Sequence, residues 1–399
     1  MTDDNKISKD KIVDRQILNL PKEVKFCTRC VMSNQRPRIT FDKDGVCSAC
    51  RYAEYKKNKI NWKKREQELR TLCDKHRSKD GSFDVIVPCS GGKDSSMIAH
   101  RLKVEYGMHP LCVTFSPPQY TDIGWRNLRR FIESGFHHYL VSPACDLYRA
   151  LGRLGFELYG DHNEIFDRGQ MSAPFRAAVE HNVSLVMYGE NGEAEYGGTS
   201  DYNESPGLPW EAFEKVYYSE DLDEIGHLAK ELGYLPNLQP HELDIFRLPP
   251  IEKLKALNIQ MHWFAYYHFW QPQEHYYYAS KYTGFQANPE GRLEGTYSDY
   301  AQLDDLTDSF LYYMMFIKYG FGRATSDAAH EIREGRITRE EGVALVRRFD
   351  GEFPEKTYKI FLEHLGLNDE QFQAVVDKYR LPHIWTKEDS KWKLRKQVE

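Results

Sequence analysis

The chain has 399 residues, of which 41% are hydrophobic and 29% are charged, and its formal net charge is −6 at pH 7. This length is enough to bury a large core and to form two or three domains. No apolar stretch approaches the roughly 20 residues that a membrane-spanning helix needs, and Met1 to Lys6 do not begin a signal peptide. We therefore expect a cytoplasmic globular protein that makes no contact with membranes.

Four of the eight cysteines form two pairs near the start of the chain. Cys27 and Cys30 make one C-x-x-C pair, and Cys47 and Cys50 make the second. Two such pairs can complete a tetrahedral zinc site, whereas disulfides are not expected in a cytoplasmic chain. We therefore expect a structural zinc ion bound by these four thiolates. An iron–sulfur cluster and unliganded thiols are the alternatives.

The region around these cysteines is strongly basic. Residues 25–80 contain 16 Lys and Arg residues but only 7 Asp and Glu residues, so the rest of the chain is acidic. The spacing of Trp62, Leu69 and Leu72 predicts an amphipathic linker helix within residues 60–77. The positive charge could contact nucleic acid, hold a polyphosphate substrate, or cover a solvated helix face.

A glycine-rich turn follows the apolar residues 84–87. Its sequence is Ser90-Gly91-Gly92-Lys93-Asp94-Ser95, and apolar residues at helical spacing come directly after it. Free N–H groups at a helix N-terminus attract polyanions, and two glycines let phosphate oxygens approach the backbone. We therefore predict a pyrophosphate site, in which Lys93 adds positive charge and Asp94 binds the Mg²⁺ that accompanies ATP. A strand-to-helix turn without a ligand is the alternative.

Four short apolar runs alternate with helical patterns. They cover residues 84–88, 110–116, 138–141 and 184–188. Strands that alternate with helices predict a parallel sheet whose ligands bind at the carboxyl ends of its strands.

Residues directly after these strands are therefore candidates for nucleotide binding. They include Ser116, Gly189, Glu190 and Asn191. The three carboxylates of residues 190–195 would hold Mg²⁺ or the ribose and adenine of the nucleotide. An acidic solvent loop is the alternative.

The composition changes after residue 245. Residues 262–285 are much richer in Trp, Tyr and Phe than the 14% average of the chain. Such density is typical of helix packing or of a subunit interface, with base or sugar stacking as the alternative, so we expect a docking surface within residues 263–285. Residues 303–365 have helical periodicity. The expected domains are an N-terminal extension (1–24), a zinc module with a basic linker helix (25–80), an ATP-binding domain (81–245) and an aromatic-rich, mainly helical C-terminal domain (246–399).

The Ser-Gly-Gly turn resembles the phosphate loop of the PP-loop ATP pyrophosphatase superfamily, which has an α/β fold of the adenine nucleotide alpha hydrolase type. Further segments make the chain similar to the N-acetyl sugar amidotransferases of the WbpG type, and this likeness covers nearly all of the chain beyond residue 25. The segments are CTRCVMS (27–33), RPRITFD (36–42), GVCSAC (45–50), GENGE (189–193), YGG (196–198), EGTYS (294–298) and FGRAT (321–325).

This resemblance implies an ATP-dependent, AMP-forming amidotransferase of bacterial surface-polysaccharide biosynthesis, such as that of the LPS O-antigen. The acetamido oxygen of a nucleotide-activated sugar would attack the α-phosphate of ATP. Ammonia would then displace AMP from the adenylated imidate and leave an acetamidino group. Lys93 would stabilise charge on the phosphates, while Asp94 and Glu190 would hold Mg²⁺.

The ammonia needs a source outside the chain. Thr2 follows Met1, and no cysteine stands in a Gly-x-Cys-x-Gly elbow, so we find no glutaminase nucleophile. The resemblance implies a separate glutaminase (HisH-like) and a cyclase-like barrel subunit (HisF-like) that deliver ammonia.

The rival interpretation is a tRNA-thiolating enzyme of the same superfamily. It needs a sulfur-carrying cysteine or a cluster near the ATP site, and only Cys89 and Cys145 are placed to serve, without C-x-x-C partners. The acidic body of the chain would also repel a long RNA, so we do not expect a nucleic-acid partner. The sugar, its nucleotide carrier and the oligomeric state do not follow from the sequence.

Overall fold

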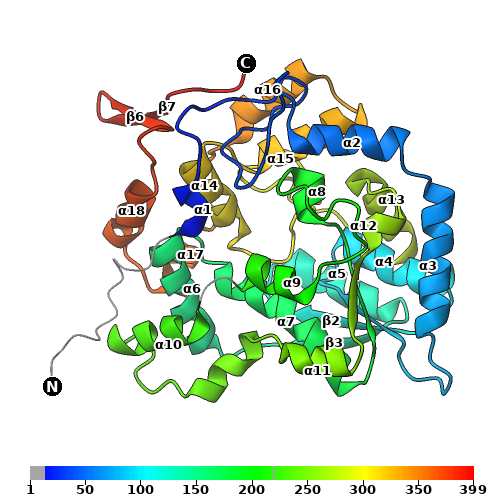
Figure 1. Ribbon diagram of the computed structural model, residues 1–399. Coiled ribbons are helices and arrows are strands. Elements are labelled where there is room, and N and C mark those ends of the chain that lie inside the picture. The colour runs from blue at the N-terminus through cyan, green and yellow to red at the C-terminus, as the bar shows by residue number, and fades with distance from the viewer. Residues whose placement is uncertain (1–13, 219–220) are drawn as a thin grey trace.

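The computed structural model describes residues 14–218 and 221–399 (Figure 1). The first element in this part of the chain is a short helix, α1 (Arg15–Leu18), which the Asp14 side chain caps by accepting a hydrogen bond from the backbone N–H of Gln16. Residues 1–13 of the expected N-terminal extension, including Met1 and Thr2, lie outside the described residues.

A five-stranded parallel sheet forms the centre of the fold. Its strands are β1 (Val85–Pro88), β2 (Pro110–Phe115), β3 (His137–Val141), β4 (Leu185–Tyr188) and β5 (Gln260–Trp263). The strand order is β3-β2-β1-β4-β5, so the predicted parallel α/β sheet is confirmed. Along the chain, β2 and β3 are added on one side of β1, and β4 and β5 are then added on its other side. The carboxyl ends of β1 and β4 therefore form the switch point, where α/β sheets bind ligands.

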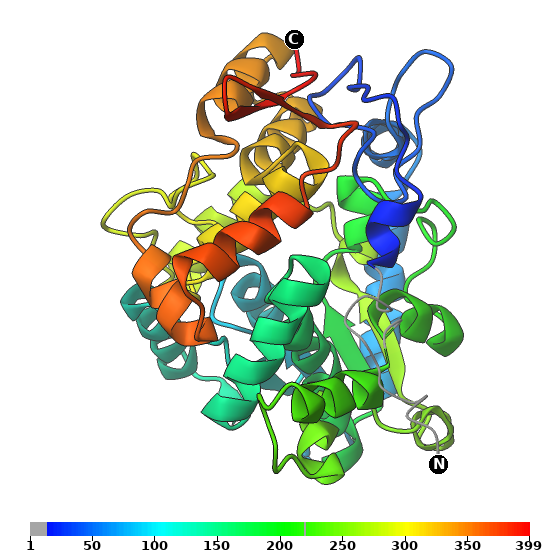
Figure 2. The same cartoon turned by 90° about the vertical axis from the view of Figure 1, so that its left-hand side faces the viewer.

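Helices cover both faces of the sheet (Figures 1 and 2). They include α3 (Trp62–His76), α4 (Lys93–Val104), α5 (Asp122–Glu133), α6 (Cys145–Tyr159) and α7 (Glu164–Glu180). Val85 and Val87 of β1 pack on one face with Leu102 of α4, whereas Ile86 packs on the other face with Phe175 of α7. This alternation is the period of two that a strand imposes on its side chains, and it explains why a continuous apolar run forms a doubly covered strand.

The sheet extends past the domain boundary that we placed at residue 245. Between β4 and β5 lie α8 (Gly192–Tyr196), α9 (Trp210–Tyr217), α10 (Leu222–Glu231), the 3-10 helix η2 (Pro240–Phe246) and α11 (Ile251–Ala256). The strand β5 has the sequence Gln-Met-His-Trp and pairs with β4 along its whole length. Its buried and partly exposed residues alternate, as expected for a strand at the edge of a sheet. This alternation covers only four residues, and the aromatic residues that follow it made the strand hard to recognise in the sequence.

The C-terminal part is mainly helical, as expected. Its helices are α12 (Phe264–Tyr267), α13 (Pro272–Tyr282), α14 (Asp308–Tyr319), α15 (Arg323–Glu334), α16 (Arg339–Phe349), α17 (Tyr358–Leu365) and α18 (Asp369–Lys378), and a hairpin of β6 (Trp385–Glu388) and β7 (Lys391–Leu394) comes near the end. In Figure 2 the blue N-terminal module and the light-orange part of the C-terminal region both lie in the upper part of the molecule.

These two regions share a hydrophobic core. Val31 and Met32 pack in one cluster with Phe321, Ala328 and Val346 of the C-terminal region. The helix α2 (Ser48–Asn58) lies beside α15 in the same part of the molecule (Figure 1). The zinc module is thus built into the body of the protein, because its apolar side chains are buried against the C-terminal helices.

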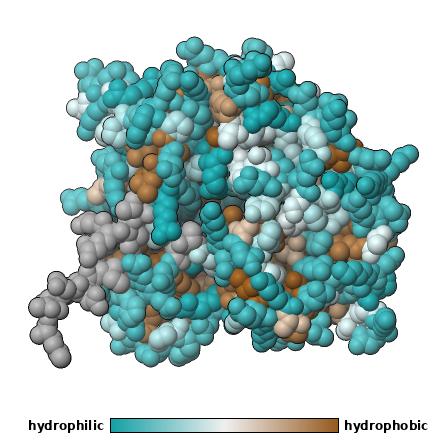
Figure 3. Space-filling view, in the orientation of Figure 1, coloured by the Kyte–Doolittle hydropathy of each residue, from teal (hydrophilic) through white to brown (hydrophobic). Residues whose placement is uncertain are grey.

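The aromatic segment is mostly buried, which corrects our expectation of an exposed docking surface. Trp263, Phe264 and Trp270 are at most 3% exposed and belong to the cores on the two faces of the sheet. Of the segment's aromatic side chains, Tyr277 and Tyr282 are clearly exposed. On the face seen in Figure 3, hydrophobic residues form small separate patches within a hydrophilic surface. The aromatic density therefore reflects packing within the chain.

Candidate active site

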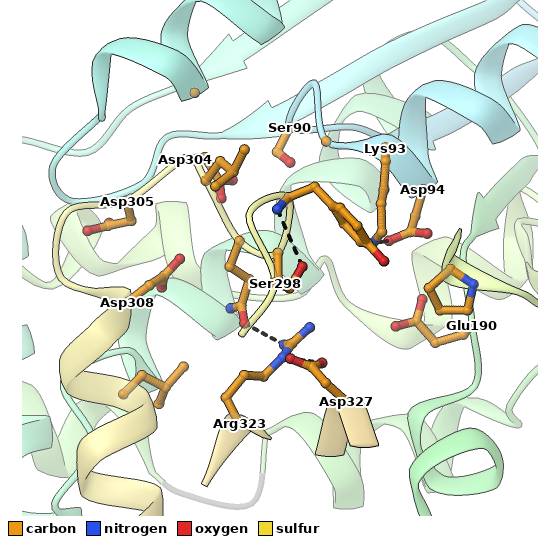
Figure 4. Close-up of a pocket in the computed structure, with 18 of the residues that line it drawn as sticks. Ser90, Lys93, Asp94, Glu190, Ser298, Asp304, Asp305, Asp308, Arg323 and Asp327 are labelled. Carbon is orange, nitrogen blue, oxygen red and sulfur yellow. Dashed lines mark hydrogen bonds and ion pairs between the residues drawn. The ribbon is translucent and has the colours of Figure 1, made fainter. Parts of the chain in front are cut away.

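A cavity of about 430 Å³ opens at the switch point of the sheet. The turn after β1, the segment after β4 and the C-terminal region from residue 298 to α15 line much of it, and residues of α5, α7 and α13 complete the lining (Figure 4). Of the residues predicted from the sequence, Ser90, Gly91, Gly92, Lys93, Asp94 and Glu190 line this cavity. The strand ends therefore bring together two segments that are about 100 residues apart in the sequence.

The turn after β1 has the geometry of an anion site. Gly91 has a φ of +82°, and a Cβ there would lie 2.5 Å from the Cα of Leu128, so glycine is required both by the backbone and by the close approach of α5. Gly92 caps α4 without any side-chain hydrogen bond. The first N–H groups of this twelve-residue helix therefore face the cavity and can receive an anion.

Asp94 is fixed from two sides at the start of α4. Its Oδ2 lies 2.6 Å from Nζ of Lys93, and its Oδ1 lies 2.7 Å from Nδ1 of His275 on α13. Burial by itself would raise the pKa of Asp94, but Lys93 and His275 outweigh it and hold that pKa well below its usual range. The backbone N–H of Gln271 donates to Nε2 of His275 at 3.4 Å, so this imidazole is set to donate from Nδ1 to Asp94. Asp94 is therefore an ionised, oriented carboxylate.

Glu190 lies close to Asp94 on the same side of the cavity (Figure 4). Burial, followed by the negative charge of Asp94, raises the pKa of Glu190 to about 7. Two carboxylates at the mouth of an anion-binding turn are the oxygen ligands that a hard divalent cation such as Mg²⁺ prefers. A bound cation would remove the repulsion between them and restore the ionised form of Glu190.

Acidic side chains from the C-terminal region line the other side of the cavity (Figure 4). Burial raises the pKa of Asp305 to about 7 and that of Asp304 above its ordinary value. Burial also raises the pKa of Asp308 well above the usual range, and the neighbouring Asp305 adds to the effect. This loop is attached to the start of α5, because the backbone N–H of Thr121, the residue that caps α5, donates to the carbonyl of Asp304 at 3.1 Å. The protonated carboxyl groups can donate hydrogen bonds, and the ionised ones can accept them from hydroxyl groups.

Four predicted residues lie outside the cavity lining. Ser95 donates from its hydroxyl group to the carbonyl of Gly92, and Asn191 caps α8 by accepting from the backbone N–H of Glu193. The Ser116 hydroxyl group donates to the carbonyl of Pro117. Gly189 lies behind the site, where a Cβ would come within 3.2 Å of Trp270. These residues support the local backbone at the strand ends.

Two of the three carboxylates after β4 have other partners, which corrects the interpretation of residues 190–195 as one ligand site. Glu193 accepts two hydrogen bonds from the guanidinium group of Arg38, at 2.6 and 2.9 Å. Glu195 is 4% exposed and lies 2.5 and 2.6 Å from Nζ of the buried Lys56 on α2. These ion pairs attach the zinc module to the segment that carries Glu190.

Several residues of the site were not predicted from the sequence. They are His275, Tyr300, Asp304, Asp305, Asp308, Arg323 and Asp327. The acidic residues 304–308 were visible as a group, but they follow no strand of the sheet. Only the packing of the loop on residues 119–121 brings them to the strand ends. His275 had no local signal, because it lies within the aromatic helix α13.

The four cysteines of the N-terminal module form one buried cluster. One ligand atom from each of Cys27, Cys30, Cys47 and Cys50 lies within 4.8 Å of the others, and two of the Sγ–Sγ distances are 3.8 Å. A tetrahedral site with Zn–S bonds of about 2.3 Å requires sulfur atoms about 3.8 Å apart. Backbone N–H groups also point at the sulfur atoms, as they do around thiolates. The cluster therefore fits a four-coordinate metal such as zinc.

Among the described residues, we find no helix with both the length and the apolar character to cross a membrane. A comparison with curated proteins found no match for the chain. Residues 294–399 match the family model described as "LPS biosynthesis protein WbpG-like, C-terminal domain". The matched region contains Arg323, Asp327 and the acidic Asp304–Asp308 side of the cavity. Residues 294–399 are therefore similar to the C-terminal domain of WbpG-like LPS biosynthesis proteins, and this part of the chain forms one wall of the cavity.

Proposed function

We propose that this protein is an ATP-dependent, AMP-forming amidotransferase that converts the acetamido group of a nucleotide-activated sugar into an acetamidino group. The observation that carries the proposal is the Ser90–Asp94 turn, which opens into a cavity at the switch point of a parallel sheet. This geometry supports a PP-loop ATP-binding site. The WbpG-like domain, with its tie to LPS biosynthesis, supports a sugar substrate in surface-polysaccharide synthesis.

In this mechanism, the acetamido oxygen attacks the α-phosphorus of ATP, and the bond to pyrophosphate breaks. Ammonia then adds to the imidate carbon, and AMP leaves with the oxygen. The N–H groups at the start of α4 and the Lys93 ammonium group would bind the phosphate oxygens as charge moves onto pyrophosphate. Asp94 and Glu190 would hold Mg²⁺, which supplies further positive charge at the phosphates.

The site needs no general base to activate the nucleophile, because neutral ammonia carries its own lone pair. We propose that ammonia comes from a separate glutaminase through a cyclase-like subunit, in the cytoplasm. The tRNA-thiolation alternative has weaker support. Cys89 is 2% exposed and Cys145 lies on the surface at the start of α6, and neither lines the cavity.

The test is product analysis with purified protein, ATP, Mg²⁺, an ammonium salt and a panel of acetamido sugar nucleotides. We expect AMP and pyrophosphate in equal amounts, and a sugar nucleotide whose mass shows the replacement of O by NH. Formation of ADP and phosphate would contradict the proposal. AMP formation that depends on tRNA and a sulfur donor would favour the thiolation alternative.

A further inference from the structure

The cavity has an unusual balance of charge. Among the described residues that line it, the basic side chains with a permanent charge are Lys93 and Arg323. Nine carboxyl groups line it as well, some ionised and some with raised pKa values: Asp94, Asp167, Glu190, Asp304, Asp305, Asp308, Asp327, Glu331 and Glu334. Lys93 is already paired with Asp94. An anionic substrate in this cavity therefore needs every cationic donor that the lining offers.

Arg323 is held rigidly at the edge of this cavity. It is the first residue of α15, within the WbpG-like domain. Its Nε donates to Oδ1 of Asp327 at 2.8 Å, and its Nη1 donates to Oε1 of Gln302 at 2.7 Å. Both partners are fixed in turn, since Thr296 donates to Asp327 and the Tyr312 hydroxyl group donates to Gln302. The guanidinium group is therefore oriented before any ligand arrives.

The remaining donors of Arg323 point into the cavity. Its Nη2 has no hydrogen-bond partner within the described part of the chain. Figure 4 shows the side chain reaching from α15 toward the centre of the cavity, opposite the turn that carries Ser90 and Lys93. The side chain is 22% exposed, so an anion bound there would be largely shielded from water. A planar guanidinium group with a free edge is the donor best suited to a phosphate.

We propose that Arg323 binds a phosphate oxygen of a substrate from the side opposite the Ser90–Asp94 turn, so that the C-terminal domain completes the phosphate site. The inference rests on the proposed function. The phosphate belongs either to ATP or to the diphosphate of the sugar nucleotide, and both present the same chemistry to the guanidinium group. In either case the WbpG-like domain contributes directly to the active site, because its arginine reaches the ligand that the sheet domain binds.

The test uses the full chain with Arg323→Gln and Arg323→Lys. Arg153→Gln is a matched control: Arg153 also pairs with a carboxylate one helical turn away, is 19% exposed, and lies outside the cavity lining. One arm measures the Kd of MgATP and of magnesium pyrophosphate by calorimetry. The other arm measures the KM of the sugar nucleotide in the ammonium-dependent reaction. Thermal unfolding of every variant checks folding.

We expect Arg323→Gln to raise either the Kd of MgATP and magnesium pyrophosphate or the KM of the sugar nucleotide roughly 10- to 100-fold. A loss of this size is typical when a charge-assisted hydrogen bond is removed. Arg323→Lys should recover part of that loss, and Arg153→Gln should match the wild type. A change in the calorimetric arm assigns the phosphate to ATP, and a change confined to the KM assigns it to the sugar nucleotide. If Arg323→Gln does not fold, Arg323→Lys decides alone.

Wild-type values in both arms for a folded Arg323 variant would overturn the inference and leave the proposed function intact. A lowered melting temperature with unchanged Kd and KM would also overturn it, because Arg323 would then serve only folding. Failure of the wild-type chain to bind MgATP and to form AMP would overturn the proposed function and this inference together.

Discussion

At the scale of single residues, the site depends on carboxylates whose protonation is set by their surroundings. Asp94 is kept ionised by Lys93 and His275, while the neighbouring Glu190 has a raised pKa and holds its proton to about pH 7. Two carboxyl groups with pKa values pushed apart are typical of functional sites. The difference arises because Asp94 has cationic and hydrogen-bonding partners, whereas Glu190 has burial and a negative neighbour.

Replacing Asp94 by Asn should lower AMP formation roughly 100-fold or more, because the change removes the charge that would hold Mg²⁺ at the phosphates. The fold should survive, since the single amide oxygen of Asn can still accept a hydrogen bond from either His275 or Lys93. Asp146→Asn is the control, because Asp146 also lies in the first turn of a helix but is exposed and outside the cavity. Product release is measured with an AMP-coupled assay, and near-normal turnover of Asp94→Asn would contradict the assigned role.

The raised pKa of Glu190 predicts that the stability of the fold depends on pH in the absence of Mg²⁺. The folded chain keeps this proton up to about pH 7, whereas an unfolded Glu loses it near its ordinary pKa of 4.5. Its ionisation therefore costs stability as the pH rises through this interval. Glu190→Gln should accordingly be stabilised relative to the wild type at pH 8 and gain much less at pH 5. Urea unfolding at both pH values checks this, and an equal difference at both would refute the raised pKa.

At the scale of elements, the zinc module is attached to the segment behind Glu190. The helix α2 contributes Lys56 to Glu195 of α8, and the loop before it contributes Arg38 to Glu193. The Arg333 side chain on α15 also donates to the carbonyl of Glu195. The module, α8 and α15 therefore meet at one point, directly beside the cavity wall.

The buried pair of Lys56 and Glu195 should be sensitive to single changes but tolerant of a paired one. Lys56→Met leaves Glu195 buried without its cation, and such changes cost about 3–5 kcal/mol. The double variant Lys56→Met/Glu195→Leu should recover most of this loss, because it removes both charges and fills the space with apolar atoms. Urea denaturation of the three proteins measures the free energies of unfolding. Additive losses in the double variant would show that the two side chains do not form a coupled pair.

The cysteine cluster should hold one zinc ion per chain. Cys47→Ser should release it and lower the melting temperature, since structural zinc sites contribute on the order of 10 kcal/mol to folding. The effect should reach the C-terminal helices, because they share a core with the module. Cys145→Ser, on the surface, is the control. Metal analysis measures the content, and iron with sulfide in place of zinc would favour the thiolation alternative.

At the scale of the whole molecule, the cavity is complete only when the sheet domain and the C-terminal region are together. The turn after β1 supplies the anion-binding helix end, and α15 with the loop of residues 298–305 supplies the opposite wall. Since the C-terminal helices share one hydrophobic core with the zinc module and another with Phe156 of α6, we regard the fold as one body. Separating the WbpG-like domain from the sheet would remove half of the site.

The expected need for an external source of ammonia concerns the chain as a whole. We found no glutaminase nucleophile in the sequence, so the isolated protein should be inactive with glutamine but active with a high concentration of ammonium salt, at a pH that provides NH₃. A cognate glutaminase and cyclase-like pair should restore the use of glutamine. The assay compares AMP release under the three conditions. Turnover with glutamine by the isolated chain would refute the requirement for a partner.

The sequence by itself determined the local features: the four strands from Asp84 to Tyr188, the glycine-rich turn, the basic linker helix and the two cysteine pairs. Each follows from a short pattern, because apolar periodicity, glycine and C-x-x-C spacing act within a few residues. Only the tertiary structure decided which carboxylates face the cavity. Glu193 and Glu195 bind the zinc module instead, while Asp304, His275 and Arg323 enter the site from far along the chain. The reason is that strand ends and docked loops are positioned by packing, and packing between distant segments leaves no local mark in the sequence.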